Sequence, residues 1–476
     1  MAGGLAGGLL LAASLPPWPV ATGAWPLALV GAALLFASLD GRAWRGRLAV
    51  GASAGVGLYA PGLWWMREFS APGYVVATLL EAAILAVAMV GVPSVKRGWR
   101  QAGAFPAALV TAEAARGAWP FGGLPLAGID LGQVGGPLGP AAVLGGRLLL
   151  VALVGTAGVG LAGLAARRWR AGAAAIAVVG VAAVAGSVAV GASLGPAFGP
   201  LSVAAVQGGG PRGLRAVETD EGEVLRAHLA ASERVRPPVG LVLWPEDVID
   251  VPAVAGSDAD AQMAALARRL GAPVVAGVVE DVDSKRFRNA AVVWAPDGRR
   301  TDRYDKVHRV PFGEYVPARR FFGLLADLSA VPRDAVAGRG AGVVDTAAGR
   351  MGVLISYEVF FADRARAAVQ AGGQVLLVPT NASSYRDAQV PAQELAAARL
   401  RALETGRWVV QAAPTGYSAV VDPSGRVHER SRLGTREVLT STVQRRTGQT
   451  LAVRLGGLWP TAMAVAVLGL ANRRRH

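Results

Sequence analysis

Long apolar stretches fill the first 200 residues and return once near the end of the chain. A bilayer crossing needs roughly 20 apolar residues in a row. The stretches that approach or reach this length lie near 3–15, 20–39, 48–66, 73–94, 103–116, 141–165, 173–194 and 451–471, of which the first is short and the fifth marginal. They predict an α-helical transmembrane bundle of about eight spans. Residues 1–199 would hold about seven spans, and residues 451–476 the last span with a basic tail.

Basic residues collect in alternate loops between these stretches. They are Arg42, Arg45, Arg47, Lys96, Arg97, Arg100, Arg167, Arg168, Arg170, Arg473, Arg474 and Arg475. Because short cytoplasmic loops carry an excess of lysine and arginine, both termini are predicted to be cytoplasmic. Residues 200–450 are then predicted to lie outside the cytoplasm.

The basic residues of these loops also contribute to the formal net charge of +15. Most of the basic excess lies in the apolar part of the chain, so it indicates membrane orientation and argues against nucleic-acid binding. The sequence has no cysteine and four scattered histidines, which argues against a metal site built from these residues. No cofactor is expected.

Charged residues also stand within the apolar stretches. Glu81 is in the middle of the fourth stretch, where a carboxylate must face protein or water, so we expect a buried polar contact. Glu113 and Arg116 are three positions apart and can pair on one face of a helix.

From residue 200 the pattern changes to short β-type runs that alternate with polar or helical stretches. The turn sequences Asp297-Gly298 and Asp422-Pro-Ser-Gly425 join pairs of these runs. Strands that alternate with helices predict an α/β sandwich, and about 250 residues are enough to bury its core. Residues 200–450 are therefore predicted to be one α/β domain.

Three segments of this domain carry residues suited to catalysis. Glu246 ends the strand-like run Leu-Trp-Pro-Glu, and Lys306 and Glu314 lie in an irregular stretch that ends at Pro317. The third segment is Ser356-Tyr357-Glu358, at the end of another strand. Taken singly, each reads as a surface, loop or sheet-end residue.

Taken together, the three segments supply what acyl transfer requires. The reaction needs a nucleophile, a base that takes its proton and a cation where the oxyanion develops. Ser356 would be the nucleophile, Glu246 the base and later the acid, and Lys306 the oxyanion partner. Glu314 and Glu358 would orient Lys306 or hold the incoming amine, and Tyr357 would support the site.

These segments resemble those of the apolipoprotein N-acyltransferase family, the membrane branch of the nitrilase or carbon–nitrogen hydrolase superfamily. The most specific match is the Tyr-x-Lys at 304–306 followed by Val-Pro-Phe-Gly-Glu-Tyr-Val-Pro at 310–317. The runs 113–117 and 398–404, Asn381 and a last apolar span add to it. The resemblance covers nearly the whole chain.

The resemblance implies a fold and a reaction. The domain would be an αββα nitrilase-like sandwich in a bacterial plasma-membrane protein. An acyl chain would pass from a phospholipid to the nucleophile, and then to the α-amine of the diacylglyceryl-cysteine of a lipoprotein. Family members use no metal or diffusible cofactor. Phe321, Phe322, Leu324, Leu325, Phe360 and Phe361 would line the acyl entrance or else belong to the core.

Several positions depart from the pattern of the family. Ser356 stands where the family has its cysteine, and Ala216 stands where a tryptophan is expected. Asn381-Ala-Ser-Ser384 replaces an Asn-Asp-x-Trp sequence, and Glu394 replaces a histidine.

Three hypotheses remain open. The chain is an N-acyltransferase that uses Ser356, or it is a catalytically impaired scaffold that binds a partner such as a polyprenol-phosphate mannosyltransferase. In the third hypothesis the serine is an engineered replacement that stalls turnover.

Overall fold

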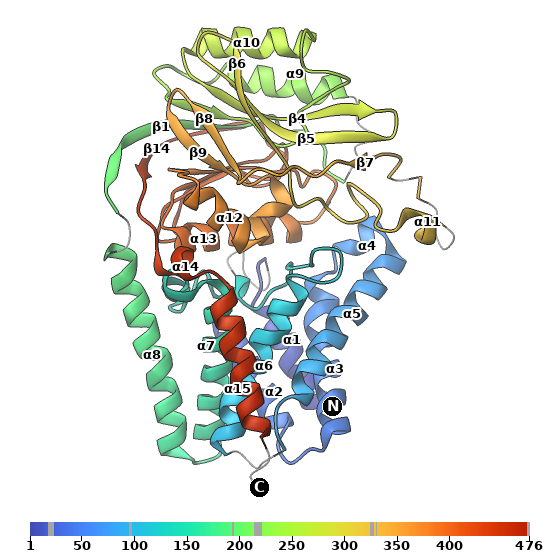
Figure 1. Cartoon of the computed structure of the whole chain (residues 1–476), viewed down its shortest axis with the longest axis vertical. Helices are drawn as coiled ribbons and strands as arrows, with labels where there is room; N and C mark the ends of the chain where they lie inside the picture. The colour runs from blue at the N-terminus through green and yellow to red at the C-terminus, as the bar shows by residue number, and fades with distance from the viewer. Residues whose placement is uncertain are drawn as a thin grey trace. The chain divides into compact units, whose positions relative to one another are not determined.

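The computed structural model describes residues 1–17, 23–94, 98–192, 195–213, 221–323, 328–329 and 331–473 (Figure 1). The chain forms two compact units. Met1–Ser193 with Thr450–His476 make up the helical unit, and Leu194–Gln449 make up the sandwich unit. Residues at both ends of the sequence thus belong to one unit, and the intervening segment folds as the other.

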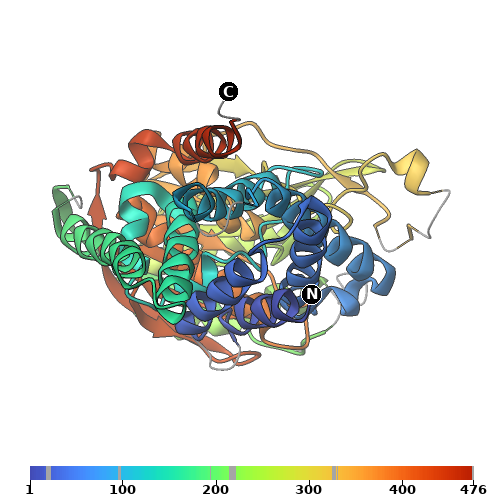
Figure 2. The same ribbon diagram turned by 90° about the horizontal axis from the view of Figure 1, so that it is seen from below.

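The helical unit is built from apolar helices that pack side by side (Figure 2). They are α1 Ala2–Ala13, α2 Trp25–Ser38, α3 Trp44–Gly62, α4 Met66–Phe69, α5 Ala71–Val90, α6 Trp99–Arg116, α7 Ala142–Ala165, α8 Trp169–Ala192, α14 Leu451–Leu455 and α15 Leu458–Asn472. Within the described residues, three helical segments are long and apolar enough to cross a membrane: Ala71–Val90, Gly139–Ala165 and Trp169–Ala192. Ala2–Ala13, Trp25–Ser38 and Leu458–Asn472 are apolar but shorter.

The last predicted span differs from the expectation of one continuous stretch at 451–471. Gly456 has φ +69° and ψ −175°, outside the helical region, and it separates α14 from α15. Hydropathy alone does not predict this break, because Gly456 carries no polar side chain. The helix ends there because of the backbone angles of Gly456, which glycine adopts readily.

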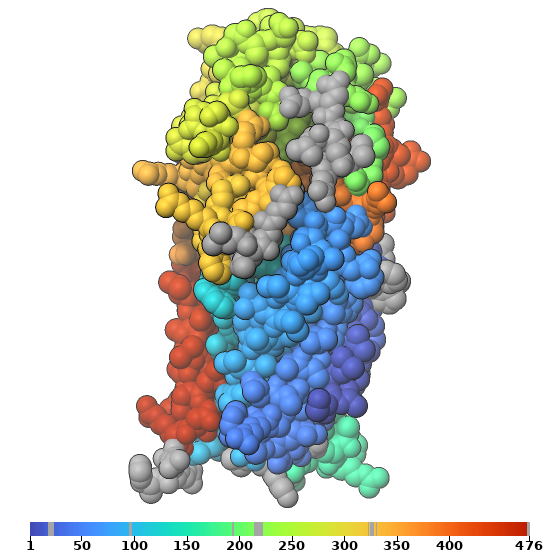
Figure 3. All heavy atoms as spheres, turned by 90° about the vertical axis from the view of Figure 1, so that its right-hand side faces the viewer, coloured from blue at the N-terminus to red at the C-terminus, as the bar shows by residue number. Residues whose placement is uncertain are grey.

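Small residues allow these helices to approach closely. A Cβ added to Gly55 of α3 would lie 2.5 Å from the Cα of Ala82 in α5, and one added to Gly158 of α7 would lie 2.7 Å from the Cβ of Ala32 in α2. In lipid the hydrophobic effect does not drive helices together, so close van der Waals contacts of this kind stabilise their association. The outward face of α5 is apolar, since Val75, Val76, Leu79 and Val87 are exposed. Figure 3 shows the blue segment that contains α5 at the surface of the molecule.

A buried ion network joins three of these helices. Arg116 of α6 donates to Glu81 of α5 at 2.7 Å and to Glu113 one turn earlier at 3.1 Å. Arg147 of α7 donates to the same oxygen of Glu113 at 2.7 Å, and also binds Asp130 at 3.2 Å. The predicted pairing of Glu113 with Arg116 and the predicted buried contact of Glu81 are therefore confirmed.

The sandwich unit contains two β-sheets. The first has the order β14-β1-β2-β4-β5-β6, with β3 on β4 and β7 on β5, and the second has the order β13-β12-β11-β10-β9-β8. The strands of the first sheet are β1 Ala197–Gln207, β2 Leu241–Leu243, β3 Ile249–Val251, β4 Val274–Asp283, β5 Arg286–Trp294, β6 Arg300–Asp305, β7 Asp334–Ala335 and β14 Glu437–Arg446. Those of the second are β8 Val343–Thr346, β9 Gly349–Val353, β10 Leu376–Pro379, β11 Val409–Ala412, β12 Ala419–Val421 and β13 Val427–Arg430.

Helices cover the outer face of each sheet, which gives four layers. These helices are α9 Glu221–Ser232, α10 Asp258–Leu270, α12 Ala362–Gln370 and α13 Gln389–Thr405, and a short α11 spans Arg319–Phe322. β1 shows why the layers form. Val203 and Ala205 point into the core between the sheets, whereas Ala204 and Val206 point toward α9 and α10, because successive side chains of a strand alternate.

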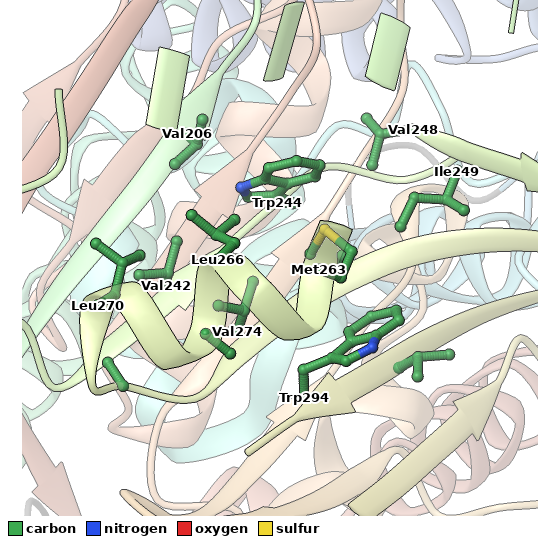
Figure 4. Packing of buried hydrophobic residues seen from close by; sticks show 14 of the residues in the cluster. Val206, Val242, Trp244, Val248, Ile249, Met263, Leu266, Leu270, Val274 and Trp294 are labelled. Carbon is green, nitrogen blue, oxygen red and sulfur yellow. The ribbon is translucent and has the colours of Figure 1, made fainter. Parts of the chain in front are cut away.

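Two buried tryptophans lie in the hydrophobic core between the first sheet and the helices that cover it (Figure 4). Trp244 donates its indole N–H to Ser232 at 3.0 Å, and Trp294 donates to Asp260 at 2.9 Å, so neither buried donor lacks an acceptor. Met263 of α10 lies in the same cluster and is fully buried.

We expect Met263→Ala to destabilise the protein by about 2–5 kcal/mol, because it leaves a cavity in a close-packed core. Thermal unfolding of the full chain in detergent measures the effect. The matched control is Met463→Ala in α15, where the side chain is 56% exposed. An equal fall in the unfolding midpoint of both variants would contradict this description of the core.

Candidate active site

The three predicted catalytic residues each follow the end of a strand. Glu246 comes after β2 and Lys306 directly after β6, both in the first sheet, and Ser356 comes after β9 in the second sheet. Gly277 of β4 packs against the backbone of Glu246, where an added Cβ would collide with the Cα of that residue. The absence of a side chain at this position lets the strands position the carboxylate.

Lys306 is the centre of a buried ion cluster. Its ammonium donates to Glu246 Oε1 at 2.7 Å and to Glu314 Oε1 at 2.8 Å. The Nδ2 of Asn289, in β5, donates to the same two oxygens at 2.8 and 3.0 Å. Lys306 is 2% exposed and Glu246 3% exposed, so these charges depend on one another for compensation.

The charges of the cluster shift the pKa values of its members. Burial lowers the pKa of Lys306, but Glu246 and Glu314 outweigh that effect and the pKa is raised, so the side chain stays an ammonium. Burial raises the pKa of Glu246, which Lys306 counters and Glu314 reinforces. The site thus holds a permanent cation beside a carboxyl group that takes up a proton more readily than usual.

Glu314 is brought to the cluster by its loop. Its second oxygen, Oε2, accepts the backbone N–H of Val310 at 2.7 Å, and Pro311 and Tyr315 form a bridge across the turn. The loop thus holds Glu314 against Lys306, and its orienting role stays a prediction.

Glu358 binds backbone rather than Lys306. Its Oε1 accepts the hydroxyl of Tyr304 at 2.7 Å and the N–H groups of Val307 and His308 at 2.8 and 3.1 Å. Its Oε2 accepts the N–H of Ile355 at 2.9 Å, and the residue is fully buried. These hydrogen bonds go to the Lys306 loop and to the turn that carries Ser356, so Glu358 acts on Lys306 through the backbone, and the alternative that it holds an amine stays a prediction.

Ser356 begins a short 3₁₀ turn and has φ +46°, an unusual conformation for a residue with a side chain. Its hydroxyl donates to Glu394 Oε1 of α13 at 3.4 Å, and Thr380 donates to the same oxygen at 2.7 Å. Burial raises the pKa of Glu394 to about 7.

Two residues of the site were missed by sequence reasoning. Glu394 was recognised only as a replaced histidine, and Asn289 was not recognised at all. Asn289 stands in an ordinary strand pattern, and no signal in the sequence marks it. Only the pairing of β4 with β5 and of β5 with β6 brings it to the cluster.

The aromatic residues predicted at the acyl entrance fall into different environments. Phe360 and Phe361 are buried, and the ring of Phe361 lies 5.0 Å from that of the buried Tyr357, so both phenylalanines belong to the core. Phe321 is 59% exposed. Leu324, Leu325 and Ala216 lie outside the described residues, as does the side chain of Phe322.

Comparison with known families agrees with this architecture. Residues 202–452, just over half of the chain, match the carbon-nitrogen hydrolase family, and residues 7–160 match the apolipoprotein N-acyltransferase N-terminal domain. The sandwich unit is thus of the carbon–nitrogen hydrolase, or nitrilase-like, class.

Curated relatives show which family within this class the chain resembles. The chain is 32% identical to the apolipoprotein N-acyltransferase of Azotobacter vinelandii, over 99% of this chain and 94% of the relative. It is 33% identical to that of Mycolicibacterium smegmatis, where the match spans 71% of this chain and 61% of the relative. The chain belongs to the apolipoprotein N-acyltransferase family, as its sequence motifs predict.

Solved structures match the sandwich unit more distantly. Nit3 of Saccharomyces cerevisiae is 20% identical with a TM-score of 0.42, over 52% of this chain and 91% of Nit3. An amidase from Nesterenkonia sp. is 22% identical with a TM-score of 0.39, over 52% of this chain and 91% of the amidase.

We expect Lys306→Met to cost about 3–5 kcal/mol of stability, because it leaves the buried carboxylate of Glu246 and the partly buried one of Glu314 without their cation. The substitution also removes the cation that lowers the pKa of Glu246. The folded variant then binds more protons than the unfolded chain, so its stability falls as pH rises from about 5 to 8. Thermal unfolding at several pH values measures both effects.

Lys285→Met is the matched control, since Lys285 lies exposed in the β4–β5 turn. Its unfolding midpoint should stay close to that of the parent protein. A pH-independent loss of stability in Lys306→Met would contradict the ionic description of the cluster.

Proposed function

We propose that this protein transfers an acyl chain from a phospholipid to the N-terminal α-amine of a diacylglyceryl-cysteine lipoprotein, with Ser356 as the nucleophile. The observation that carries the proposal is the buried Glu246–Lys306–Glu314 cluster, within a chain that matches a named N-acyltransferase along nearly its whole length. The family name indicates the reaction, and the cluster supplies groups that can perform it.

Lys306 would stabilise the tetrahedral oxyanion. An ammonium has three N–H donors, and two of them have acceptors among the described residues, Glu246 and Glu314. The third remains for the oxygen that gains negative charge as the nucleophile attacks. In a buried site such a donor is worth far more than in water.

Glu246 would exchange protons with the reacting groups. Its raised pKa favours the uptake of a proton, which it would give to the alkoxide of the departing lysophospholipid. As a carboxylate it then takes a proton from the attacking amine.

The helices of the helical unit are proposed to be about eight membrane spans, with both termini cytoplasmic and residues 200–450 outside. The three long apolar helical segments, the apolar exposed faces and the basic loops support this topology. A lipid donor and a lipid-anchored acceptor would both reach a site held at the outer membrane surface. A glycosyltransferase partner stays a prediction from the resemblance alone.

The topology is testable because the chain has no cysteine. We expect Ser284→Cys, in the exposed β4–β5 turn, to react with a membrane-impermeant maleimide applied to cells in which the outer surface is accessible. Ala43→Cys, exposed at the start of α3, should react only after the membrane is opened. The opposite pattern would reverse the proposed orientation.

The reaction is testable with purified full-length protein, phosphatidylethanolamine and a diacylated lipopeptide. Wild type should form a triacylated peptide and carry an acyl group on Ser356, both visible by mass spectrometry, and Ser356→Ala should do neither. Ser356→Cys should be faster, because a thiol with a pKa of about 8.5 ionises far more readily than a hydroxyl. The absence of product from both wild type and Ser356→Cys would refute the proposed function.

A further inference from the structure

A second carboxyl group, distinct from Glu246, contacts the nucleophile. Glu394 lies on α13 and is 3% exposed, and its Oε1 is 3.4 Å from Ser356 Oγ. That distance is long for a hydrogen bond, as is common in the absence of substrate. Thr380, which follows β10, donates to the same oxygen at 2.7 Å and so limits the positions that the carboxyl group can take.

The charges around Glu394 suit proton exchange near neutral pH. Burial raises its pKa most, the hydrogen bonds from Thr380 and Ser356 lower it, Glu246 raises it and Lys306 lowers it, and together these effects bring the pKa to about 7. Glu246 and Lys306 are the charged groups that act on it from the first sheet. A base whose pKa lies near the working pH is the most effective acceptor of a proton.

We propose that Glu394 is the base that takes the hydroxyl proton of Ser356, and that Thr380 positions it. This assignment rests on the proposed acyl transfer and deepens it. It separates two tasks between two carboxyl groups, since Glu394 serves the nucleophile and Glu246 serves the leaving group and the amine.

The proton cycle balances. In the first half, Ser356 Oγ bonds to the ester carbonyl carbon, its proton passes to Glu394, and the ester C–O bond breaks as Glu246 protonates the lysophospholipid alkoxide. In the second half, the amine nitrogen bonds to the same carbon and gives a proton to Glu246. The C–Oγ bond then breaks and Oγ recovers its proton from Glu394, so both carboxyl groups return to their starting states.

The assignment explains how a serine can act at this position. A hydroxyl is a weak nucleophile without an adjacent base, and the ion cluster already holds Glu246 against Lys306 and Asn289. The hydrogen bond that the structure gives Ser356 Oγ goes to Glu394. A thiol at the same place would depend far less on a base of its own.

The first test uses a fluorophosphonate probe on the full-length protein. The probe reports the reactivity of Ser356 without lipid substrates, because Oγ bonds to phosphorus and fluoride leaves. Wild type should be labelled at Ser356 with a rate that rises with pH and levels off above about 7. Glu394→Gln keeps an acceptor for Thr380 but cannot take a proton, and should be labelled roughly 100-fold more slowly or worse.

Glu429→Gln, an exposed change of the same type in β13, is the matched control and should label like wild type. Thermal unfolding of Glu394→Gln verifies that the variant is folded. Labelling of folded Glu394→Gln at the wild-type rate overturns the assignment. So does labelling that slows as pH rises, which would make Glu394 a proton donor at rest.

The second test measures the coupling of the two side chains. We expect Glu394→Gln to slow formation of the acyl-enzyme from phosphatidylethanolamine by roughly 100-fold with Ser356, but only a few-fold in the Ser356→Cys protein. An equal loss in both backgrounds overturns the assignment, since it would mean that Glu394 acts on the fold of the site.

The two hypotheses fail in different ways. If wild type reacts with the fluorophosphonate in the Glu394-dependent manner but transfers no acyl chain, the base assignment stands and the proposed function falls. If acyl transfer proceeds normally in Glu394→Gln, the base assignment falls and the proposed function stands.

Discussion

The site depends on the buried charge of Lys306. An ammonium that is 2% exposed is stable only where carboxylates compensate it, and Glu246 and Glu314 both lie within 2.8 Å. These two acids come from the end of β2 and from an irregular loop, so the cluster requires both segments to meet at one point. Asn289 joins the two acids through one amide and adds a third element to the same requirement.

Glu358 extends this constraint from the first sheet to the second. Its carboxylate accepts the hydroxyl of Tyr304 in β6 and two backbone N–H groups that follow β6, and it also accepts the N–H of Ile355, which precedes Ser356. Ser356 itself adopts φ +46°, a conformation that costs free energy and persists only where its surroundings enforce it. One buried carboxylate therefore links the strained turn to the loop that carries Lys306.

Glu394 relates two of the departures from the family pattern, the serine at position 356 and the glutamate at position 394, to each other. The serine in place of a cysteine reads as a loss when it is considered alone. The structure places it beside Glu394, which is another of the departing residues, and Thr380 holds that carboxyl group in position. A weak nucleophile needs an adjacent base, so the serine and Glu394 are consistent with each other.

The helical unit also compensates its buried charges, since its buried acids Glu81 and Glu113 both bind Arg116.

The sequence by itself determined the family and the α/β character of residues 200–450, and it predicted that Glu246, Lys306 and Ser356 belong to one site. Apolar stretches, strand and helix alternation and the 304–317 motif are local properties, so they can be read without a structure. The contact of Glu113 with Arg116 was also predictable, because residues three apart on a helix are neighbours.

Tertiary structure alone decided the partners of these residues. Asn289 reaches Lys306 through the pairing of β5 and β6, and Glu394 reaches Ser356 across 38 positions of sequence. Glu358, expected to act on Lys306, instead accepts the backbone N–H groups of Val307 and His308, which follow Lys306 in the chain. Residue types indicate which chemistry is possible. Strand order and burial determine which side chains come within hydrogen-bonding distance, and a hydrogen bond forms only at that short range.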